Sequence, residues 1–588
     1  MRVLFMLKSR TAPLPDYSLE SRMPGLFPGK HRHLFLHFGD SMMKPRTAAA
    51  SSFGRWIAAA LLVLAAALAP AQAAVPPAAP QSPPTAPAAQ SPTTPTRITP
   101  EQSKQLFGMV DQLLKFASDE TGLPIKSEVK RQLTTRAAVE AYLRKQMNDD
   151  QDAKRFQRSE LVLKKFGLLD RDFDLKPFLL QLLGEQIEAY YDPKTKTVNL
   201  LDWVSPDEQK TVLAHELTHA LQDQHVDLVK WSDQTPPDVS TTFAEDNVHI
   251  QKDEMDTARE AVTEGQATAV MMDNMLKPMG RSLIKDPEVV EILKQHMNGS
   301  ADSPILARAP LLLSESLMFP YREGLSFEQD IWMDKGRESA FAGTLDHPPS
   351  SSWEIINPRM YEQGLIPPIP LLPNIHPLLD PLYRPYDIGQ VGQLDVQILT
   401  GLFGGDNAAR DFTPAWDGGL YWAGQLRRAT PAEQATTKSI AIFYLSRWRN
   451  SASAVNFAHL YASELGSKYS GLTEDKAAEA AATANGDMQQ VFSTNEGPVV
   501  ITTRDKMVFV SESFPLELAR KLTQLVLDSQ GSGALKLAAV HPAASEALTP
   551  AWPTQSLSSG FVRFFARCGV VKAAVDAALH AAAAQPAR

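Results

Sequence analysis

The chain contains a single cysteine, Cys568, among 588 residues. One thiol cannot form a disulfide within the chain, and the lack of a Cys-x-x-Cys pair excludes thiolate zinc sites and dithiol redox sites. Any metal bound by this protein must therefore be held by histidine and carboxylate ligands.

The sequence also lacks an apolar run long enough to span a bilayer. The run Trp56 to Ala69 has 14 residues, fewer than the roughly 20 needed, which argues against a membrane anchor. Basic residues precede this run, and Ala71-Gln72-Ala73 follows it as a small-x-small cleavage site. We interpret residues 43–73 as a signal peptide that exports a bacterial protein to the periplasm or beyond, with no stable membrane span after cleavage.

The first 42 residues show no periodicity and precede a well-formed signal. We interpret residues 1–42 as an extension that arises from a start codon assigned too early, with Met42 or Met43 as the true start.

The sequence also has no excess of positive charge. Without residues 1–73 the chain carries 49 basic and 64 acidic residues, a net charge of −15. This balance argues against nucleic acid or anionic lipid as a partner.

The remaining sequence changes character several times. Residues 74–98 are rich in Pro and Ala and predict a linker. Apolar spacing from Thr99 to about Leu169 predicts helices, and residues 186–201 predict a hairpin. Seven prolines in residues 366–385 predict a connection between domains. We expect an α+β protein, with a mainly helical domain over residues 99–365, a smaller α+β domain over 386–530 and an Ala-rich tail over 531–588.

A helix is predicted from about Pro206 to about Gln224. Ser205 can cap it, Pro206 suits its first position, and Glu208 completes a Ser-x-x-Glu capping box. This helix carries His215-Glu216-Leu-Thr-His219, whose two histidines are four residues apart and therefore share one face. They can bind one tetrahedral zinc ion, and Glu216 can deprotonate the water that the ion activates.

A hydrolytic zinc site needs a third protein ligand. His225 follows His219 at the spacing seen in metzincins, but Gln222 occupies the glycine position, and a continuing helix would point His225 about 240° away. Glu264, on a second helix predicted over Asp253 to Leu276, is our first choice. Its neighbour Gly265 would let this helix pack closely against the first.

Two further acids on the second helix are alternatives to Glu264. Glu260 lies one turn earlier on the same face and is the fallback ligand. Asp256 could orient a ligand histidine, but solvation at the surface is our preferred interpretation of this residue.

These motifs resemble the zincin clan, within it the glutamate-ligand branch typified by thermolysin, and more narrowly a group of uncharacterised secreted bacterial metallopeptidase-like proteins. The residues that carry the resemblance are Glu185-Gln186, Tyr191-Asp-Pro-Lys-Thr195, His215 through His225, Glu264-Gly-Gln-Ala-Thr268, Phe319-Pro-Tyr321 and His347-Pro-Pro349 with Asn357-Pro358 and Tyr361.

The resemblance implies one zinc ion held by His215, His219 and Glu264, with Glu216 as general base. It also implies that the hairpin through Tyr190 and Tyr191 offers an edge strand to an extended peptide. An oxyanion in such a site is commonly stabilised by a His or Tyr across the cleft, a role open to His347 or Tyr361.

We therefore expect a secreted or periplasmic zinc endopeptidase with a protein or peptide substrate. One alternative is a zincin-like module that has lost hydrolysis and serves as an envelope binding or chaperone protein. Another is a latent enzyme whose residues 99–180 are docked in its own cleft.

Overall fold

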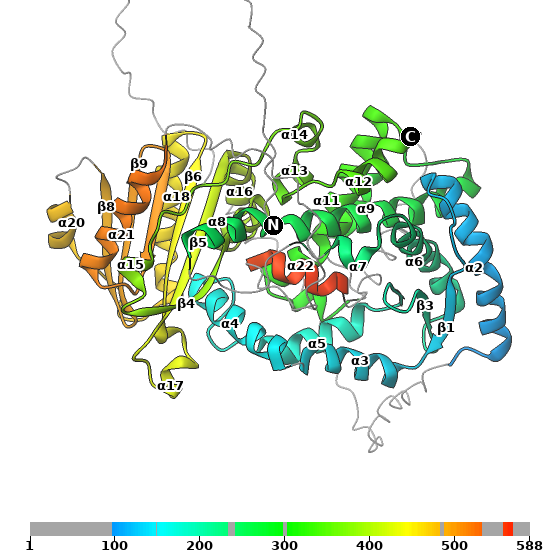
Figure 1. The fold of residues 1–588 in the computed structure, drawn as a ribbon, viewed down its shortest axis with the longest axis horizontal. Helices are drawn as coiled ribbons and strands as arrows, with labels where there is room; N and C mark the ends of the chain where they lie inside the picture. The colour runs from blue at the N-terminus through cyan, green and yellow to red at the C-terminus, as the bar shows by residue number, and fades with distance from the viewer. Residues whose placement is uncertain are drawn as a thin grey trace, which may run out of the picture. The chain divides into compact units, whose positions relative to one another are not determined.

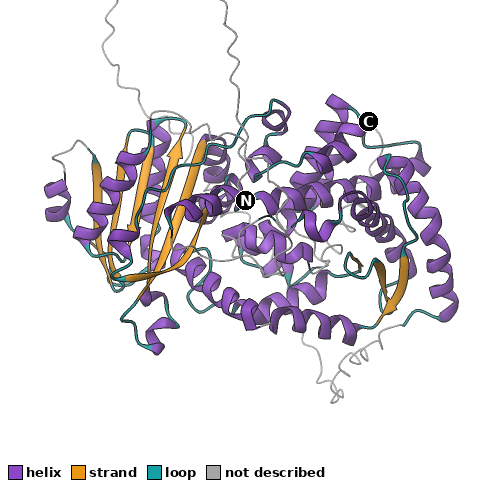
Figure 2. Cartoon of the chain, viewed as in Figure 1, coloured by secondary structure: helices purple, strands orange, loops and turns teal. Residues whose placement is uncertain are grey.

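The computed structural model describes residues 97–148, 150–232, 234, 242–297, 303–482, 487–531 and 557–567. The predicted extension, the signal peptide and most of the linker lie outside these residues. The described chain is an α+β protein (Figures 1 and 2). None of its described helices is both long and apolar enough to cross a membrane.

The first region is mainly helical. Its helices are α2 (Pro100–Thr121), α3 (Arg136–Asn148), α4 (Asp150–Phe166), α5 (Leu175–Gln186), α6 (Pro206–Val226), α7 (Leu228–Trp231), α8 (Phe243–Lys252), α9 (Met255–Leu276), α10 (Glu288–His296), α11 (Leu311–Lys335), α12 (Thr344–Asp346), α13 (Ser352–Ile356) and α14 (Pro358–Glu362). A small sheet of β1 (Lys130–Thr134), β2 (Ala189–Asp192) and β3 (Thr197–Leu201) accompanies them in the order β1-β3-β2.

The predicted hairpin is confirmed as β2 and β3, which pair antiparallel. The third strand, β1, is a correction, because residues 99–169 were expected to be helical throughout. Its sequence Lys-Arg-Gln-Leu-Thr is short and polar, and its partner β3 lies more than 60 residues away along the chain. Local periodicity carries no signal for such a strand, since parallel pairing depends on distant residues.

The second region is built on a seven-stranded antiparallel sheet. Its strands are β4 (Tyr383–Gln390), β5 (Trp416–Leu426), β6 (Ile440–Trp448), β7 (Thr473–Glu474), β8 (Met488–Thr494), β9 (Gly497–Arg504) and β10 (Met507–Glu512), in the order β4-β5-β6-β10-β9-β8-β7. Its helices are α15 (His376–Leu379), α16 (Gln393–Phe412), α17 (Pro431–Gln434), α18 (Ser451–Ser463), α19 (Leu465–Lys468), α20 (Lys476–Ala482) and α21 (Leu516–Ser529).

Alternating side chains on the large sheet face two different cores. Tyr444 of β6 packs with Phe457 of α18 in the same hydrophobic core that fills the helical region. Its neighbour Phe443 points to the other face, where it packs with Phe509 and with residues of α21. The Pro-rich segment 366–385 therefore marks a change of secondary structure, while the hydrophobic core continues from the helical region onto one face of the sheet.

The segment predicted as an Ala-rich tail contributes a helix, α22 (Leu557–Arg567). Its side chains Phe561 and Phe565 are buried, and the helix packs against α11 and α9 (Figure 1). The backbone N–H of Ser558 donates a hydrogen bond to the buried carboxylate of Asp395. These contacts fix α22 on the helical region.

Candidate metal centre

Helix α6 begins where the sequence predicts. The Ser205 hydroxyl accepts a hydrogen bond from the Glu208 N–H, and the Glu208 carboxylate accepts one from the Ser205 N–H. The capping box is thus complete, with Pro206 in the first turn. Most of the helix from Val212 to Asp223 is buried, so its polar side chains must find partners inside the protein.

Helix α9 crosses α6 and is buried along most of its length. The prediction that Gly265 allows close packing against α6 is wrong about the partner. A Cβ at Gly265 would lie 2.3 Å from the backbone oxygen of Gly324 in α11, and a Cβ at Gly324 would lie 2.1 Å from the oxygen of Ala261. These two glycines let α9 and α11 touch backbone to backbone, which fixes the position from which Glu264 reaches α6.

His215, His219 and Glu264 converge on one point. The two Nε2 atoms lie 2.9 Å apart, and the Glu264 Oε2 lies 3.0 Å from His215 Nε2 and 3.5 Å from His219 Nε2. The three side chains are 0%, 13% and 8% exposed. Of the His, Cys, Asp and Glu side chains in the described ranges, only these three form a group that could hold a metal ion.

The spacing of the three atoms fits a tetrahedral ion. Ligands with zinc bonds of about 2.05 Å in a regular tetrahedron lie about 3.3 Å apart, and the observed separations fall on both sides of that value. Two imidazole nitrogens and one carboxylate oxygen are also a ligand set that zinc commonly takes, with the fourth position open.

Gln222 fixes the tautomer of His219. The Gln222 Nε2 donates to the Thr263 carbonyl and to Gln266 Oε1, so its Oε1 faces His219 Nδ1, at 2.8 Å. The Nδ1 must then carry a proton, and in the neutral imidazole the Nε2 presents its lone pair to the cluster. The donor chemistry of this histidine therefore suits a bound cation.

The amide chain that holds Gln222 continues through the core. Gln266 Nε2 donates to the carbonyls of Ala340 and Phe341, both at 3.0 Å, and to the Thr344 hydroxyl. The two carbonyls belong to a single π-helical turn, Ser339–Gly343, a form that is frequent at functional sites. The orientation of His219 thus depends on residues from α6, α9 and this turn.

Charges within the cluster favour an ionised Glu264. Burial alone would raise the pKa of this carboxyl, but the charge of His219 and hydrogen bonds with His215 and His219 hold it well below its usual range. The hydroxyl of Tyr321, on α11, shares a hydrogen bond with Glu264, and its ring stacks on the His215 imidazole with centroids 6.2 Å apart. Burial, followed by the Glu264 charge, raises the pKa of Tyr321 far above its usual value, so the phenol stays protonated and can donate.

Glu216 points to the edge strand. Its Oε2 accepts a hydrogen bond of 2.6 Å from the backbone N–H of Tyr191 in β2, and the residue is 1% exposed. The Tyr191 side chain is largely buried, and its hydroxyl donates to Asp223. Glu216, the predicted base, thus stands between His215 and His219 in the sequence, and its carboxylate contacts the backbone of β2.

The structure separates the other candidate histidine ligand from the cluster. Helix α6 continues through His225, whose Nε2 lies 3.0 Å from a carboxylate oxygen of Asp346. The glycine needed to turn the chain is absent, because Gln222 stands there and serves His219 instead.

The remaining candidates lie outside the three-ligand group. Glu260 is buried, and its charge favours the protonated form of His219. Asp256 is buried rather than solvated, and its carboxylate accepts from the Gln234 N–H. His347 is exposed, and its carbonyl accepts a hydrogen bond from the Tyr361 hydroxyl, so the two proposed oxyanion residues contact each other.

Gln222 and Tyr321 both belong to motifs found in the sequence, but those motifs assign neither of them its role at the site. Gln222 stands three residues after His219, a spacing at which helical side chains meet, so this signal was available. Tyr321 lies on a helix more than 50 residues beyond Glu264, and its contact with that residue has no local signature.

No family model matches the chain, and neither the curated proteins nor the solved structures give a match.

Proposed function

We propose that this chain is an exported zinc-dependent metallopeptidase of the zincin type. The observation that carries the proposal is the convergence of His215, His219 and Glu264, with atoms 2.9 to 3.5 Å apart. Glu216 follows His215 directly in the sequence, on the same helix. The export signal predicted in residues 43–73 supports a periplasmic or extracellular location.

Zinc in such a site supplies a Lewis acid that acidifies water and polarises a peptide carbonyl. Glu216 would take the proton from the attacking water and pass it to the amine of the leaving fragment. The Tyr191 N–H holds the Glu216 carboxylate in place. The buried surroundings of His215 and Glu264 keep bulk water from competing for their lone pairs.

The test compares the wild type with Glu216→Gln in casein digestion, with zinc quantified by mass spectrometry in both. Glutamine keeps an oxygen for the Tyr191 N–H but cannot accept a proton, so we expect a loss of about 10²- to 10⁴-fold in rate at unchanged zinc content. Glu338→Gln, at an exposed position, is the matched control.

Undiminished digestion by Glu216→Gln would contradict the assigned mechanism. A wild-type protein that binds zinc but cleaves neither casein nor peptides would favour the binding-module alternative. Latency through residues 99–180 is a weaker alternative, because α2 packs along α6 and β1 pairs with β3, so this part of the chain belongs to the common core.

A further inference from the structure

The outer edge of β2 faces the proposed base. Among the described strands, β2 pairs only with β3. The Tyr191 N–H donates to Glu216, so this group points away from β3 and toward α6. A peptide that runs along this edge of β2 would therefore pass directly beside the Glu216 carboxylate, which already accepts the Tyr191 N–H.

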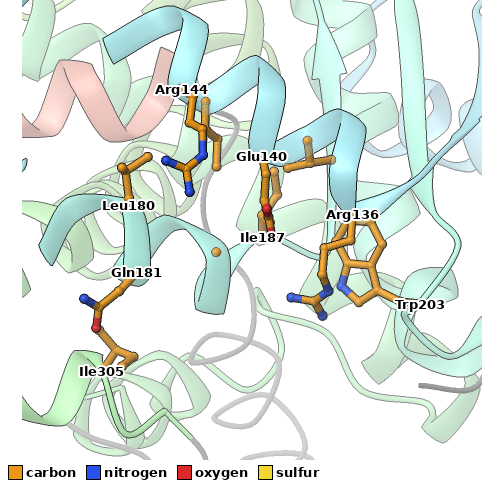
Figure 3. A pocket seen from close by; sticks show the side chains of 11 residues that line it. Arg136, Glu140, Arg144, Leu180, Gln181, Ile187, Trp203 and Ile305 are labelled. Atoms are coloured by element: carbon orange, nitrogen blue, oxygen red, sulfur yellow. The ribbon is translucent and has the colours of Figure 1, made fainter. Parts of the chain in front are cut away.

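A cavity of about 380 Å³ lies at the amino end of the same strand (Figure 3). Ile187, two residues before β2, contributes to its wall, together with residues of α3 and α5. Val139 and Leu143 of α3 are buried and form an apolar floor. Arg136 and Arg144 lie at the exposed rim, and the Arg136 guanidinium stacks over Trp203 at 4.7 Å from the ring centroid.

The size and chemistry of this cavity suit one large side chain. Its volume is at the lower end for small-molecule pockets, but it exceeds the volume of any single amino-acid side chain. Its walls are mostly apolar, and the charged groups stand at its mouth. A leucine or aromatic side chain could thus be buried while the peptide backbone stays near the polar rim.

The distance between the cavity and Glu216 along β2 determines how many residues would separate that side chain from the bond that is cut. Four residues of extended chain, from Ile187 to Tyr191, span about 13 Å. A peptide paired with β2 would reach the cavity three or four residues away from the bond beside Glu216.

We infer that this cavity is a specificity subsite that binds a large apolar side chain of an extended peptide, three or four residues from the bond that is cut. This inference rests on the proposed function, because it takes the peptide bond that is cut to lie beside Glu216. It identifies the substrate class as unfolded or extended segments with a leucine or aromatic residue at that distance.

Gly184 of α5 gives a direct way to fill the cavity. It belongs to the lining, and a Cβ at this position meets no heavy atom within 4 Å. Gly184→Phe should place its ring in the cavity without strain. Gly108→Phe is the matched control, because Gly108 of α2 is exposed, has equally open surroundings and lies outside the lining.

Binding is measured in the Glu216→Gln background, so that peptides stay intact. The probes are end-blocked, fluorescein-labelled decapeptides of Ala and Ser that carry one Phe at successive positions, followed by fluorescence anisotropy. We expect one Phe position to bind at least about tenfold more tightly than the Phe-free peptide. Gly184→Phe should remove that gain, while Gly108→Phe and Gly184→Ala should retain it.

Equal affinity for all Phe positions, an unchanged gain in Gly184→Phe, or no binding of any peptide would overturn the inference. A failure of the proposed function alone would give a different result from a failure of this inference. In that case the position-dependent binding would persist, but the wild type would leave the same peptides uncut.

Discussion

Two buried polar clusters in this protein invite comparison. In the lysine–glutamate cluster (Lys165, Lys468, Glu496 and Glu512), each carboxylate meets an ammonium group: Lys165 lies 2.8 Å from Glu496 and Lys468 lies 2.5 Å from Glu512. In the metal centre, one carboxylate and two imidazoles meet around a point to which the chain itself supplies no fixed cation.

The difference lies in charge balance. Burial lowers the pKa of Lys165 to about 8, although the Glu496 and Glu512 charges counter that effect. Burial alone would raise the pKa of Glu512, but the charges of Lys468 and Lys165 hold it below its usual range. The cations that balance these carboxylates belong to the chain itself, with Arg171 as a further partner of Glu496, and they tie α4 and α19 to the large sheet.

In the metal centre, the only cation that the cluster itself can supply is a protonated His219, whose pKa is lowered by burial but raised overall by Glu264. A metal ion would take the place of that proton, because the neutral imidazole, with its Nδ1 proton directed at Gln222, presents a lone pair at Nε2. Buried polar groups thus indicate a metal site where a displaceable proton, and not a lysine, balances their charge.

The strongest test of this contrast removes a metal ligand. His215→Ala and Glu264→Ala should reduce zinc from about one ion per chain to nearly none, because three ligands are the minimum for such a site. A chelator should lower the melting temperature of the wild type but not of Glu264→Ala.

His225→Ala and Glu260→Ala are the controls and should keep their zinc. Full occupancy in Glu264→Ala, or loss of zinc in His225→Ala, would contradict the ligand assignment.

Substitutions in the lysine–glutamate cluster should change the stability of the protein and not its zinc content. Lys468→Met removes the ammonium group that contacts the buried Glu512 carboxylate and should cost about 3–5 kcal/mol in the free energy of unfolding. Urea unfolding of zinc-loaded protein measures this, and zinc content should not change. Lys476→Met, at an exposed ion pair, is the control and should unfold like the wild type.

A double variant, Lys468→Met with Glu512→Gln, should recover part of the loss, because the uncompensated charge is gone. A zinc deficit in folded Lys468→Met would show that the two clusters are not independent.

The sequence predicts those parts of the site that depend on neighbours along the chain. The capping box at Ser205 and the shared face of His215 and His219 are encoded within one helix, and the structure has both. Glu264 required a choice between two acids on one helical face, and the neighbouring Gly265 guided it, although this glycine packs against α11 rather than α6.

What could not be predicted depends on long-range packing. The contact of Gly265 with Gly324 joins two helices whose crossing no spacing reveals. Strand β1 exists because β3 is there to pair with it, and α22 is fixed by Asp395 and the surfaces of α9 and α11. Each is a property of the assembled core rather than of a segment.

A smaller effect is expected at the residue that orients His219. Gln222→Ala removes the acceptor of the Nδ1 proton and a partner of the buried Gln266 amide. We expect zinc affinity to fall about 10- to 100-fold, measured by competition with a chelating dye. Gln224→Ala, on the same helix but bonded to Lys126 and Ser127, should bind zinc like the wild type.

The ¹⁵N shifts of the His219 ring give a readout that fold stability alone would not change. Gln222→Ala should populate both tautomers in the zinc-free protein, whereas the wild type should hold the proton on Nδ1. A single Nδ1-protonated form in Gln222→Ala would show that another group sets the tautomer.

The smallest effect should come from a hydroxyl one step beyond the ligands. Tyr321→Phe keeps the ring that stacks on His215 but removes the hydrogen bond to Glu264, and the carboxylate then loses one of the groups that orient it. We expect zinc affinity to fall by less than about tenfold, since one neutral hydrogen bond contributes about 1 kcal/mol. Tyr361→Phe is the matched control, because its hydroxyl binds the His347 carbonyl and not the cluster. If Tyr361→Phe instead lowered kcat with zinc binding intact, that result would support the predicted role of the Tyr361 hydroxyl in stabilising the oxyanion.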